Sequence, residues 1–313
     1  MNFQQLRIVR ETARRNYNLT EVAAALYTSQ SGVSKHIKDL EDELGVELYV
    51  RKGKRLLGMT EPGKELLAVV ERMLHDAANI RRIAEQFTQR DVGHLVVATT
   101  HTQARYALPE VVAGFIREYP KVHLALHQGS PREIAAMLLT GDADIGIATE
   151  TLADEPGLAT FPFYAWRHSV VVPRAHPLAD RTAVTLAELV EHPVITYPPG
   201  YTGRGRIDAA FAAQGLVAEV AITALDADVI KTYVAMGLGV GIVTPKAFDA
   251  QRDPELVRID DGSLFAENVV RIAVRRGHYL RGFGYRFIGL CSDALDEATV
   301  QQAIAPRRDD EIG

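Results

Sequence analysis

Hydrogen-bonding side chains recur at close spacing in one short segment near the amino terminus. Residues 30–38 read QSGVSKHIK, so amide, hydroxyl and ammonium groups follow one another at three- and four-residue intervals. On a helix this spacing places them on one face, and their reach suits base edges and phosphates in the major groove of DNA. The residues expected to make those contacts are Thr28, Ser29, Gln30, Ser31, Ser34, Lys35 and Lys38.

Two apolar sets with helical spacing predict the helices that position this segment. The sets are Leu19, Val22, Ala23 and Leu26, and then Val33, Ile37, Leu40 and Leu44. Between them lies a polar break, 27–30, with a helix cap at Thr28 or Ser29. Two short amphipathic helices joined by a tight turn predict a helix-turn-helix. A helical hairpin in an ordinary α-helical core is the alternative for the same pattern.

A basic segment follows and predicts the wing of a winged helix-turn-helix. Two short extended runs, 46–50 and 56–59, flank the sequence RKGKR. We expect its tip to contact phosphate or enter a minor groove through Arg51, Lys52, Lys54 and Arg55. A solvated charge run is the general alternative, but the position directly after a helix-turn-helix favours contact with DNA. Residues 1–60 are therefore expected to form a DNA-binding domain.

Charge and composition limit the classes of protein. The formal net charge is −5, yet residues 1–90 carry a net +3 and the remaining residues a net −8. A mildly basic first part on an acidic body fits local phosphate contact rather than general coating of nucleic acid. The single cysteine, Cys291, allows no intrachain disulfide and no cysteine-based metal cluster. Neither a cofactor nor a metal site is expected.

The amino terminus and the hydropathy pattern predict a cytoplasmic protein. The first residues, MNFQQLRIVRE, carry charges from Arg7 onward and contain no uninterrupted apolar core, so they do not predict a signal peptide. No run of about 18 apolar residues occurs, so no membrane span is expected.

A long amphipathic helix is predicted over about 61–90. Pro62 occupies its first turn, and apolar residues recur at helical spacing from Leu66 to Phe87. Such a stripe needs a partner, so we expect this linker helix to dimerise with its copy. Docking of the stripe on the chain's own body is the alternative.

Strands and helices alternate from about residue 91 onward, which predicts βαβ units and a mainly parallel sheet. The expected strands lie at 95–100, 122–128, 143–149, 169–173, 193–198, 221–225, 240–245 and 268–276, and one long helix is expected over 102–120. Because the chain crosses out near 163–166 and back near 267–269, we expect two α/β lobes, 91–164 plus 268–313 and 165–267. In periplasmic-binding-protein folds two such lobes face each other across a cleft, and open α/β sheets bind ligands at the carboxyl ends of their strands.

A second set of polar side chains follows the ends of these predicted strands. Hydroxyl, amide and indole groups there, with backbone N–H groups at helix amino termini, suit a small anion. The candidate effector-binding residues are Thr100, Thr102, Gln103, Ser130, Thr149, Trp166 and Thr202. Thr and Ser are also common helix caps, and for Ser130 alone a cap is the favoured interpretation. Groups aimed at one gap from both lobes favour a small sulfate- or carboxylate-bearing ligand.

These residues also carry a resemblance to a known family. A winged helix-turn-helix followed by a long linker helix resembles the LysR-type transcriptional regulators. In the body, TTHTQARYALP (99–109), HQGSP (127–131), DADIGIATE (142–150), YTGR (201–204) and DADVIKTYVAMGLGVGI (226–242) resemble the CysB/Cbl branch of that family, closest to CysB. Ser31 departs from the pattern, in which proline follows the glutamine, and base preference at the edge of the site is expected to differ.

The resemblance implies a transcriptional activator of sulfur assimilation and cysteine biosynthesis genes. It further implies N-acetylserine or O-acetylserine as inducer, with sulfate or thiosulfate as anti-inducer. The implied partners are double-stranded promoter DNA, RNA polymerase and further copies of the chain in a homotetramer, a dimer of dimers. Of the effector-site residues named above, those that match the pocket of this branch are Thr100, Thr102, Gln103, Thr149, Trp166 and Thr202. The alternative within the family is a Cbl-like regulator of sulfonate-utilisation and sulfate-starvation genes.

Two other classes of protein fit parts of the sequence. A small-anion solute-binding protein has two such lobes but needs a signal peptide. An enzyme acting in the cleft has candidate acid–base groups in His101, Asp142, Asp144, Asp226 and Asp228. No nucleophile elbow, metal-ligand spacing or glycine-rich dinucleotide loop accompanies them in the sequence, so we do not expect an enzyme.

Overall fold

The computed structural model describes residues 1–306 apart from 54, 89, 150 and 260–263. The chain forms two compact units, 1–85 and 86–313. Within the described ranges, none of the helices combines the length and the apolar character needed to cross a lipid bilayer.

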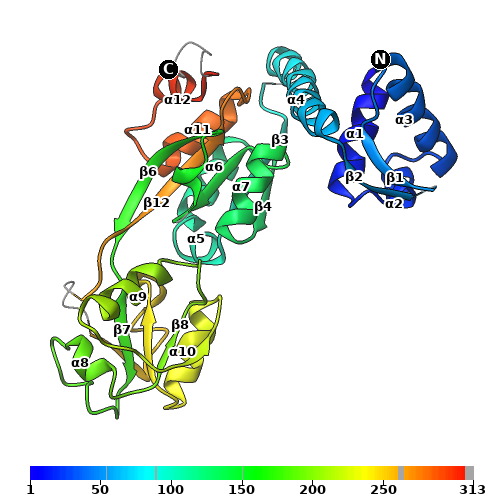
Figure 1. The fold of residues 1–313 in the computed structure, drawn as a ribbon. Coiled ribbons are helices and arrows are strands. Elements are labelled where there is room, and N and C mark those ends of the chain that lie inside the picture. Colours follow the sequence, from blue (N-terminus) through cyan, green and yellow to red (C-terminus); the bar gives the residue numbers. More distant parts are fainter. Residues whose placement is uncertain (54, 89, 150, 260–263, 307–313) are drawn as a thin grey trace, which may run out of the picture. The chain divides into compact units, whose positions relative to one another are not determined.

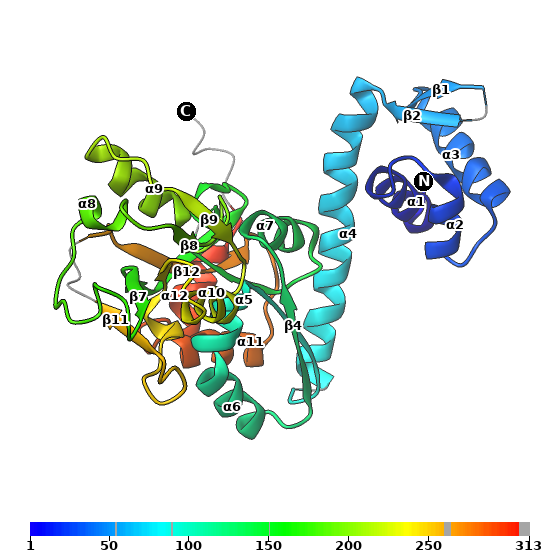
Figure 2. The same ribbon diagram turned by 90° about the horizontal axis from the view of Figure 1, so that it is seen from below.

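Three helices and a two-stranded hairpin begin the first unit, which we call the head (Figures 1 and 2). The elements are α1 Phe3–Arg14, α2 Leu19–Ala25, α3 Gln30–Leu44, β1 Tyr49–Lys52 and β2 Arg55–Met59, followed by α4 Glu61–Thr88. Helices α2 and α3 begin after Asn18 and Ser29, whose side chains accept hydrogen bonds from first-turn amides, and α3 ends at Gly45 in the left-handed region. Strands β1 and β2 pair antiparallel. The predicted winged helix-turn-helix is confirmed.

The apolar core of the head includes part of α4. Ile8, Val22 and Val33 are fully buried, and Val70 and Leu74 of α4 join the same cluster. The chain's own head therefore covers the first part of the predicted linker stripe, for which the sequence predicted pairing with a second copy. Large apolar side chains remain exposed along the helix at Val69, Met73, Ile80, Ile83 and Phe87.

A buried carboxylate connects α3, the recognition helix of the helix-turn-helix, to the wing formed by β1 and β2. Glu41 of α3 accepts hydrogen bonds through Oε1 from the backbone amides of Leu48, at 2.8 Å, and Tyr49, at 3.3 Å. Its Oε2 accepts a third from Nη2 of Arg51 at 2.6 Å. Because these partners satisfy a charge that is only 9% exposed, the start of β1 is fixed relative to α3.

Two five-stranded sheets form the two lobes of the second unit, 86–313 (Figure 1). Lobe one has the strand order β4-β3-β5-β12-β6. Its strands are β3 Gly93–Thr99, β4 Val122–Gln128, β5 Ile145–Ala148, β6 Leu158–Trp166 and β12 Asn268–Arg275. Its helices are α5 His101–Tyr106, α6 Pro109–Glu118, α7 Pro131–Thr140, the 3-10 helix η1 Leu152–Asp154, α11 Gly282–Cys291 and α12 Glu297–Ile304.

Lobe two has the strand order β11-β7-β10-β8-β9. Its strands are β7 Ser169–Pro173, β8 Val194–Thr196, β9 Val220–Thr223, β10 Val240–Val243 and β11 Leu256–Ile259. Its helices are α8 Leu186–Leu189, α9 Arg204–Ala213, α10 Ala227–Ala235 and the 3-10 helix η2 Pro245–Ala247. The chain passes from lobe one to lobe two between β6 and β7 and returns into β12, so two crossovers connect the lobes.

The second unit differs from the sequence prediction in three ways. Both sheets are mixed rather than mainly parallel, because β12 runs antiparallel to β5 and β6, and β7 runs antiparallel to β10 and β11. Strand β7 directly follows the first crossover between the lobes, and β12 directly follows the second. The helix expected over 102–120 is two helices, because Pro109 starts a new one at its first position. Strands β6 and β11 were not predicted.

We predict that Glu41→Ala lowers the free energy of unfolding of the head by about 2–4 kcal/mol, because it leaves two buried amides and Arg51 without their acceptor. Urea denaturation of the full chain, followed by circular dichroism, measures this change. The single tryptophan, Trp166, lies in the second unit, so its fluorescence reports that unit separately. Asp42→Ala removes an exposed carboxylate from the neighbouring position and is the control. Equal midpoints for the two variants would contradict the role of Glu41.

Candidate DNA interface and effector cavity

The outward face of α3 is polar and accessible. Gln30, Ser31, Lys35 and Lys38 are exposed and Ser34 is half-buried. Buried residues of the same helix, such as Val33 and Ile37, face the core of the head. The helix therefore presents the predicted side chains on the side that remains free to enter a groove.

The turn before α3 uses part of the predicted polar set for structure. Oγ of Ser29 accepts a hydrogen bond from the Gly32 amide at 3.1 Å and lies 3.2 Å from Oγ of Ser31. Thr28 is half-buried beside this cap. Tyr27, which the sequence analysis took only as part of the break, is 98% exposed with a φ of +52°. Its phenol is a further donor directly beside the recognition helix.

A groove of about 600 Å³ connects the start of α3 with the wing. Gln30 of α3, Arg55 of β2 and Arg15 at the end of α1 all line it. The sequence analysis predicted Gln30 and Arg55 but not Arg15. The position of Arg15 depends on the turn that follows, where Asn16 and Tyr17 both have positive φ values.

The wing residues divide into two groups. Lys52 and Arg55 are exposed and free to meet phosphate. The guanidinium of Arg51 turns back to Glu41, so its first role is in the fold of the head. Lys54, the fourth predicted residue, lies outside the described residues.

A cavity of about 350 Å³ lies between the two lobes. Four of the predicted effector residues line it, namely Thr100, Thr102 and Ser130 from lobe one and Thr202 from lobe two. Hydroxyl groups of Thr102 and Thr202 approach to 3.4 Å across the gap. The cavity therefore brings hydroxyls from both lobes to one place, as the sequence suggested.

The hydroxyls of Ser130 and Thr100 differ in the hydrogen bonds that they already make within the protein. Ser130 caps α7, since its Oγ accepts from the Glu133 amide at 3.2 Å and donates to Glu133 Oε2 at 2.8 Å. The interpretation of Ser130 as a helix cap is thus the better one. Thr100 precedes α5 but makes no side-chain capping bond, and it is only 5% exposed. Its hydroxyl is accordingly better placed to serve a ligand.

The other three predicted residues do not line the cavity. Gln103 is held by Tyr164, whose hydroxyl donates to Gln103 Oε1 at 2.6 Å. Burial raises the pKa of Tyr164 to about 12, so it remains a donor at neutral pH. Thr149 is half-buried just after β5. Trp166 is buried, and its indole N–H has no hydrogen-bond partner in the part of the chain that the structure describes.

Several further residues line the cavity that the sequence did not predict as effector ligands. They are His101, Gln128, Gly129, Glu133, Tyr201, Leu225 and Asp226, of which His101 and Asp226 were considered only as acid–base groups of an enzyme. Nε2 of His101 lies 3.0 Å from Oδ2 of Asp226, and Nδ1 lies 3.0 Å from Oε1 of Gln128. Residues 101 and 226 come from different lobes, so only the folded chain shows their pairing.

A second link between the lobes lies beside the cavity. Nε of Arg105 and the hydroxyl of Tyr106, both from lobe one, bond the carboxylate of Asp228 in lobe two at 3.0 and 2.8 Å. Partial burial acts to raise the pKa of Asp228, but hydrogen bonds from Tyr106 and Lys231 outweigh it and lower the pKa. Asp228 is therefore charged at neutral pH and anchors both lobe-one side chains.

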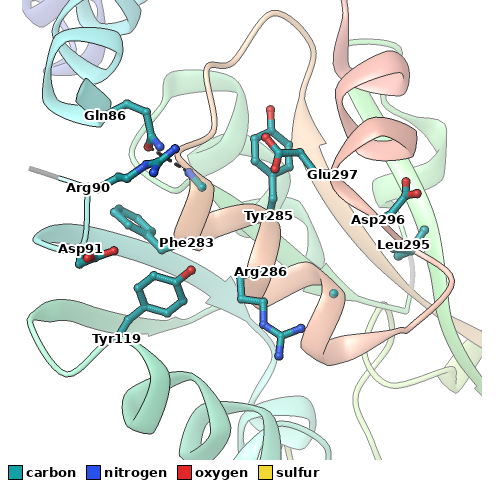
Figure 3. A pocket seen from close by; sticks show the side chains of 12 residues that line it. Gln86, Arg90, Asp91, Tyr119, Phe283, Tyr285, Arg286, Leu295, Asp296 and Glu297 are labelled. Carbon is teal, nitrogen blue, oxygen red and sulfur yellow. Dashed lines mark hydrogen bonds between the residues drawn. The ribbon is translucent and has the colours of Figure 1, made fainter.

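A larger cavity, of about 530 Å³, lies where the end of α4 meets lobe one (Figure 3). Oε1 of Gln86 accepts a hydrogen bond from the Gly282 amide at 3.1 Å, which ties α4 to the start of α11. Cations and carboxylates are mixed around the rim, at Arg90, Asp91, Arg286, Asp296 and Glu297. Arg286 is already bonded to Glu118. Mixed charge of this kind does not favour a site for one class of charged ligand.

We predict that the double variant Arg105→Ala/Tyr106→Phe populates wider lobe separations, because Asp228 loses both of its lobe-one partners and keeps only Lys231 of its own lobe. Spin labels at Glu110→Cys in lobe one and Val217→Cys in lobe two allow pulsed distance measurement on the full chain, since both positions are exposed. Burial raises the pKa of the Cys291 thiol to about 12, so the native cysteine labels poorly.

The matched control for this experiment is Asp208→Ala, which removes an ion pair with Arg204 inside lobe two. Loss of two hydrogen bonds to a charged group shifts the equilibrium between closed and open lobes by roughly tenfold or more. A distance distribution that matches that of the control would rule out the anchor.

Two family descriptions match the chain. "Bacterial regulatory helix-turn-helix protein, lysR family" matches residues 3–64, and "LysR substrate binding domain" matches residues 88–296. The first covers α1, α2, α3, the wing and the start of α4, and the second covers both lobes, apart from α12, and the crossovers between them.

Curated relatives resemble the chain over almost its whole length. The regulator SsuR of Burkholderia cenocepacia is 58% identical over 300 residues, covering 96% of this chain and 97% of its own. Cbl of Escherichia coli is 52% identical over 312 residues, covering 100% and 99%. CysB of Burkholderia cenocepacia is 48% identical over 304 residues, covering 97% of both chains.

A crystal structure of the cofactor-binding domain of the Cbl transcriptional regulator superposes on the second unit. It covers 69% of this chain and 95% of its own, with a TM-score of 0.67 and 45% identity. The chain therefore belongs to the LysR family of transcriptional regulators, in the branch with SsuR, Cbl and CysB, and it is a DNA-binding regulator with an effector-binding domain rather than an enzyme.

Proposed function

We propose that the chain is a Cbl-like activator of sulfonate-utilisation and sulfate-starvation genes. The support is the ranking of identities, 58% with SsuR and 52% with Cbl against 48% with CysB. The resemblance alone pointed first to cysteine biosynthesis, and that role is the second candidate.

The proposed effector is a small anion, either an acetylserine with its carboxylate group or inorganic sulfate or thiosulfate. The observation that carries this proposal is the cavity with hydroxyls from both lobes, Thr100, Thr102 and Thr202. Hydroxyl donors bind an oxyanion without a full opposing charge, which suits reversible binding. The volume of about 350 Å³ falls in the range of organic ligands, roughly 300–1,000 Å³. N-acetylserine, O-acetylserine, sulfate and thiosulfate are therefore the first compounds to test.

In the proposed DNA complex, α3 enters the major groove. The residues that read bases are Gln30, Ser31, Ser34 and Lys35. Lys38, Lys52, Lys54 and Arg55 neutralise phosphates, and Arg15 joins them across the groove that it shares with Arg55. We leave Arg51 out of this set because Glu41 holds it.

The proposed assembly is a homotetramer that recruits RNA polymerase. The apolar side chains that stay exposed on α4, among them Ile80 and Phe87, are suited to pairing with a second copy. Effector binding between the lobes favours one lobe angle over another, and this population shift alters how paired heads meet two half-sites.

We predict that Lys38→Ala and Arg55→Ala each weaken binding to all DNA sequences and reduce the salt-dependence slope by about 1. Fluorescence anisotropy with promoter and random duplexes at several salt concentrations measures both quantities. Lys64→Ala removes an exposed head lysine that pairs with Glu61, and it serves as the control. If either variant loses affinity only for the promoter duplex, the phosphate role is wrong for that residue.

We predict that Thr100→Val and Thr202→Val each weaken effector binding by roughly tenfold or more, because each leaves an oxyanion without a donor in a buried site. Calorimetry of the full chain with the four compounds named above tests this, and DNA affinity without effector should not change. Ser130→Ala is informative as a comparison, because its hydroxyl is occupied by Glu133. Undiminished binding in both valine variants would remove the cavity from the proposal.

A further inference from the structure

One buried imidazole lies where the two crossovers between the lobes meet. His168 lies between β6 and β7 on the first crossover, and Asn268 begins β12 on the second. Nδ1 of His168 is 3.5 Å from Nδ2 of Asn268, and Trp166 packs edge-on against the imidazole with ring centroids 4.6 Å apart. Only 3% of His168 is exposed. The His168 side chain therefore contacts both crossovers at the point where they leave the sheet of lobe one.

The same imidazole holds the backbone of a cavity residue. Nε2 of His168 donates to the carbonyl of Thr202 at 2.9 Å. A carbonyl only accepts, so Nε2 carries the proton, and Nδ1 is left as the acceptor for the Asn268 amide. Burial lowers the pKa of His168 to about 4, so the ring is neutral at physiological pH and keeps this tautomer.

Thr202 needs such support because its backbone is in an unfavourable region. Its φ is +44°, which is uncommon for a β-branched residue. Such a conformation persists only where the surroundings fix it. The next residue, Gly203, also has a positive φ, and a Cβ there would collide with Asn268 Oδ1 and with Cε1 of His168 at 2.8 Å. The turn is thus packed directly against the imidazole.

This conformation aims the hydroxyl of Thr202 at the other lobe. Its Oγ1 lies 3.4 Å from Oγ1 of Thr102, at the cavity that we propose as the effector site. We infer that His168 is a positioning residue for effector binding, which holds Thr202 in its left-handed conformation and links that ligand contact to both crossovers. This inference rests on the proposed function of the cavity.

Two substitutions separate the hydrogen bond from simple packing. His168→Gln places an amide N–H near the position of Nε2 and keeps the donor. His168→Leu fills similar space without one. We expect the leucine variant to bind the tightest of the four compounds, acetylserines, sulfate and thiosulfate, roughly tenfold more weakly, and the glutamine variant to recover most of that loss. His176→Leu is the control, since His176 is a half-buried lobe-two histidine that does not line the cavity.

A double-variant cycle tests whether His168 acts through Thr202. In a Thr202→Val background the further change His168→Leu should cost little affinity, because the hydroxyl that it positions is absent. A purely structural role for His168 predicts losses that add. If Thr202→Val weakens binding and the His168 variants do not, this inference fails while the proposed site stands. If Thr202→Val has no effect, the proposed site itself fails.

The crystal structure of the His168→Leu chain gives a test that needs no ligand. We expect Thr202 to leave the left-handed region and its hydroxyl to move away from Thr102. An unchanged φ near +44° with the 3.4 Å contact intact would overturn the positioning role. Calorimetric and crystallographic results together thus decide the inference whatever the natural effector is.

Discussion

The effector-binding unit depends on one antiparallel ladder, between β6 and β12. The ladder begins with Asn268 opposite Trp166 and ends with Arg275 opposite Leu158. Both strands belong to the sheet of lobe one, and both lead into the crossovers to lobe two. Backbone hydrogen bonds fix the two strands as far as Trp166 and Asn268, so rotation of the lobes has to begin beyond these residues. That is where the buried imidazole of His168 and the turn at Thr202 lie.

The contacts that cross between the lobes are mainly polar. His101 meets Asp226, Arg105 meets Asp228, and the ammonium of Lys246 lies 4.3 Å from the ring centroid of Tyr164. Large apolar clusters instead lie within lobe one and within lobe two. Partly exposed ion pairs are worth only about 0–1 kcal/mol each, whereas the apolar cores hold each lobe rigid. Under the proposed function, a ligand with modest affinity therefore suffices to change the lobe angle without disturbing either lobe.

Much of the fold could be predicted from the local periodicity of apolar residues. The predictions that failed concern features that depend on contacts between residues far apart in the sequence. The helix-turn-helix and most strands were predicted because their spacing is local. Strand β6 was not, since Pro162 interrupts its sequence and its partner β12 is about 100 residues away. The predicted hydroxyls Thr100, Thr102 and Thr202 do meet at one cavity, because strand ends share an edge. Residue types alone did not reveal that the guanidinium of Arg51 forms an ion pair with Glu41.

Under the proposed function, the polar lining of the cavity favours selection by the whole ligand rather than by its anionic group alone. Asp226 and Glu133 place two carboxylates at the cavity, and a bare oxyanion gains nothing from them. Both are already satisfied, Glu133 by the Ser130 cap and Asp226 by His101 and the Asp228 amide. A ligand with its anionic end at the threonines and a hydrogen-bond donor at its other end fits both regions. A second anionic end would meet these carboxylates and be repelled, which gives discrimination that hydroxyls alone do not provide.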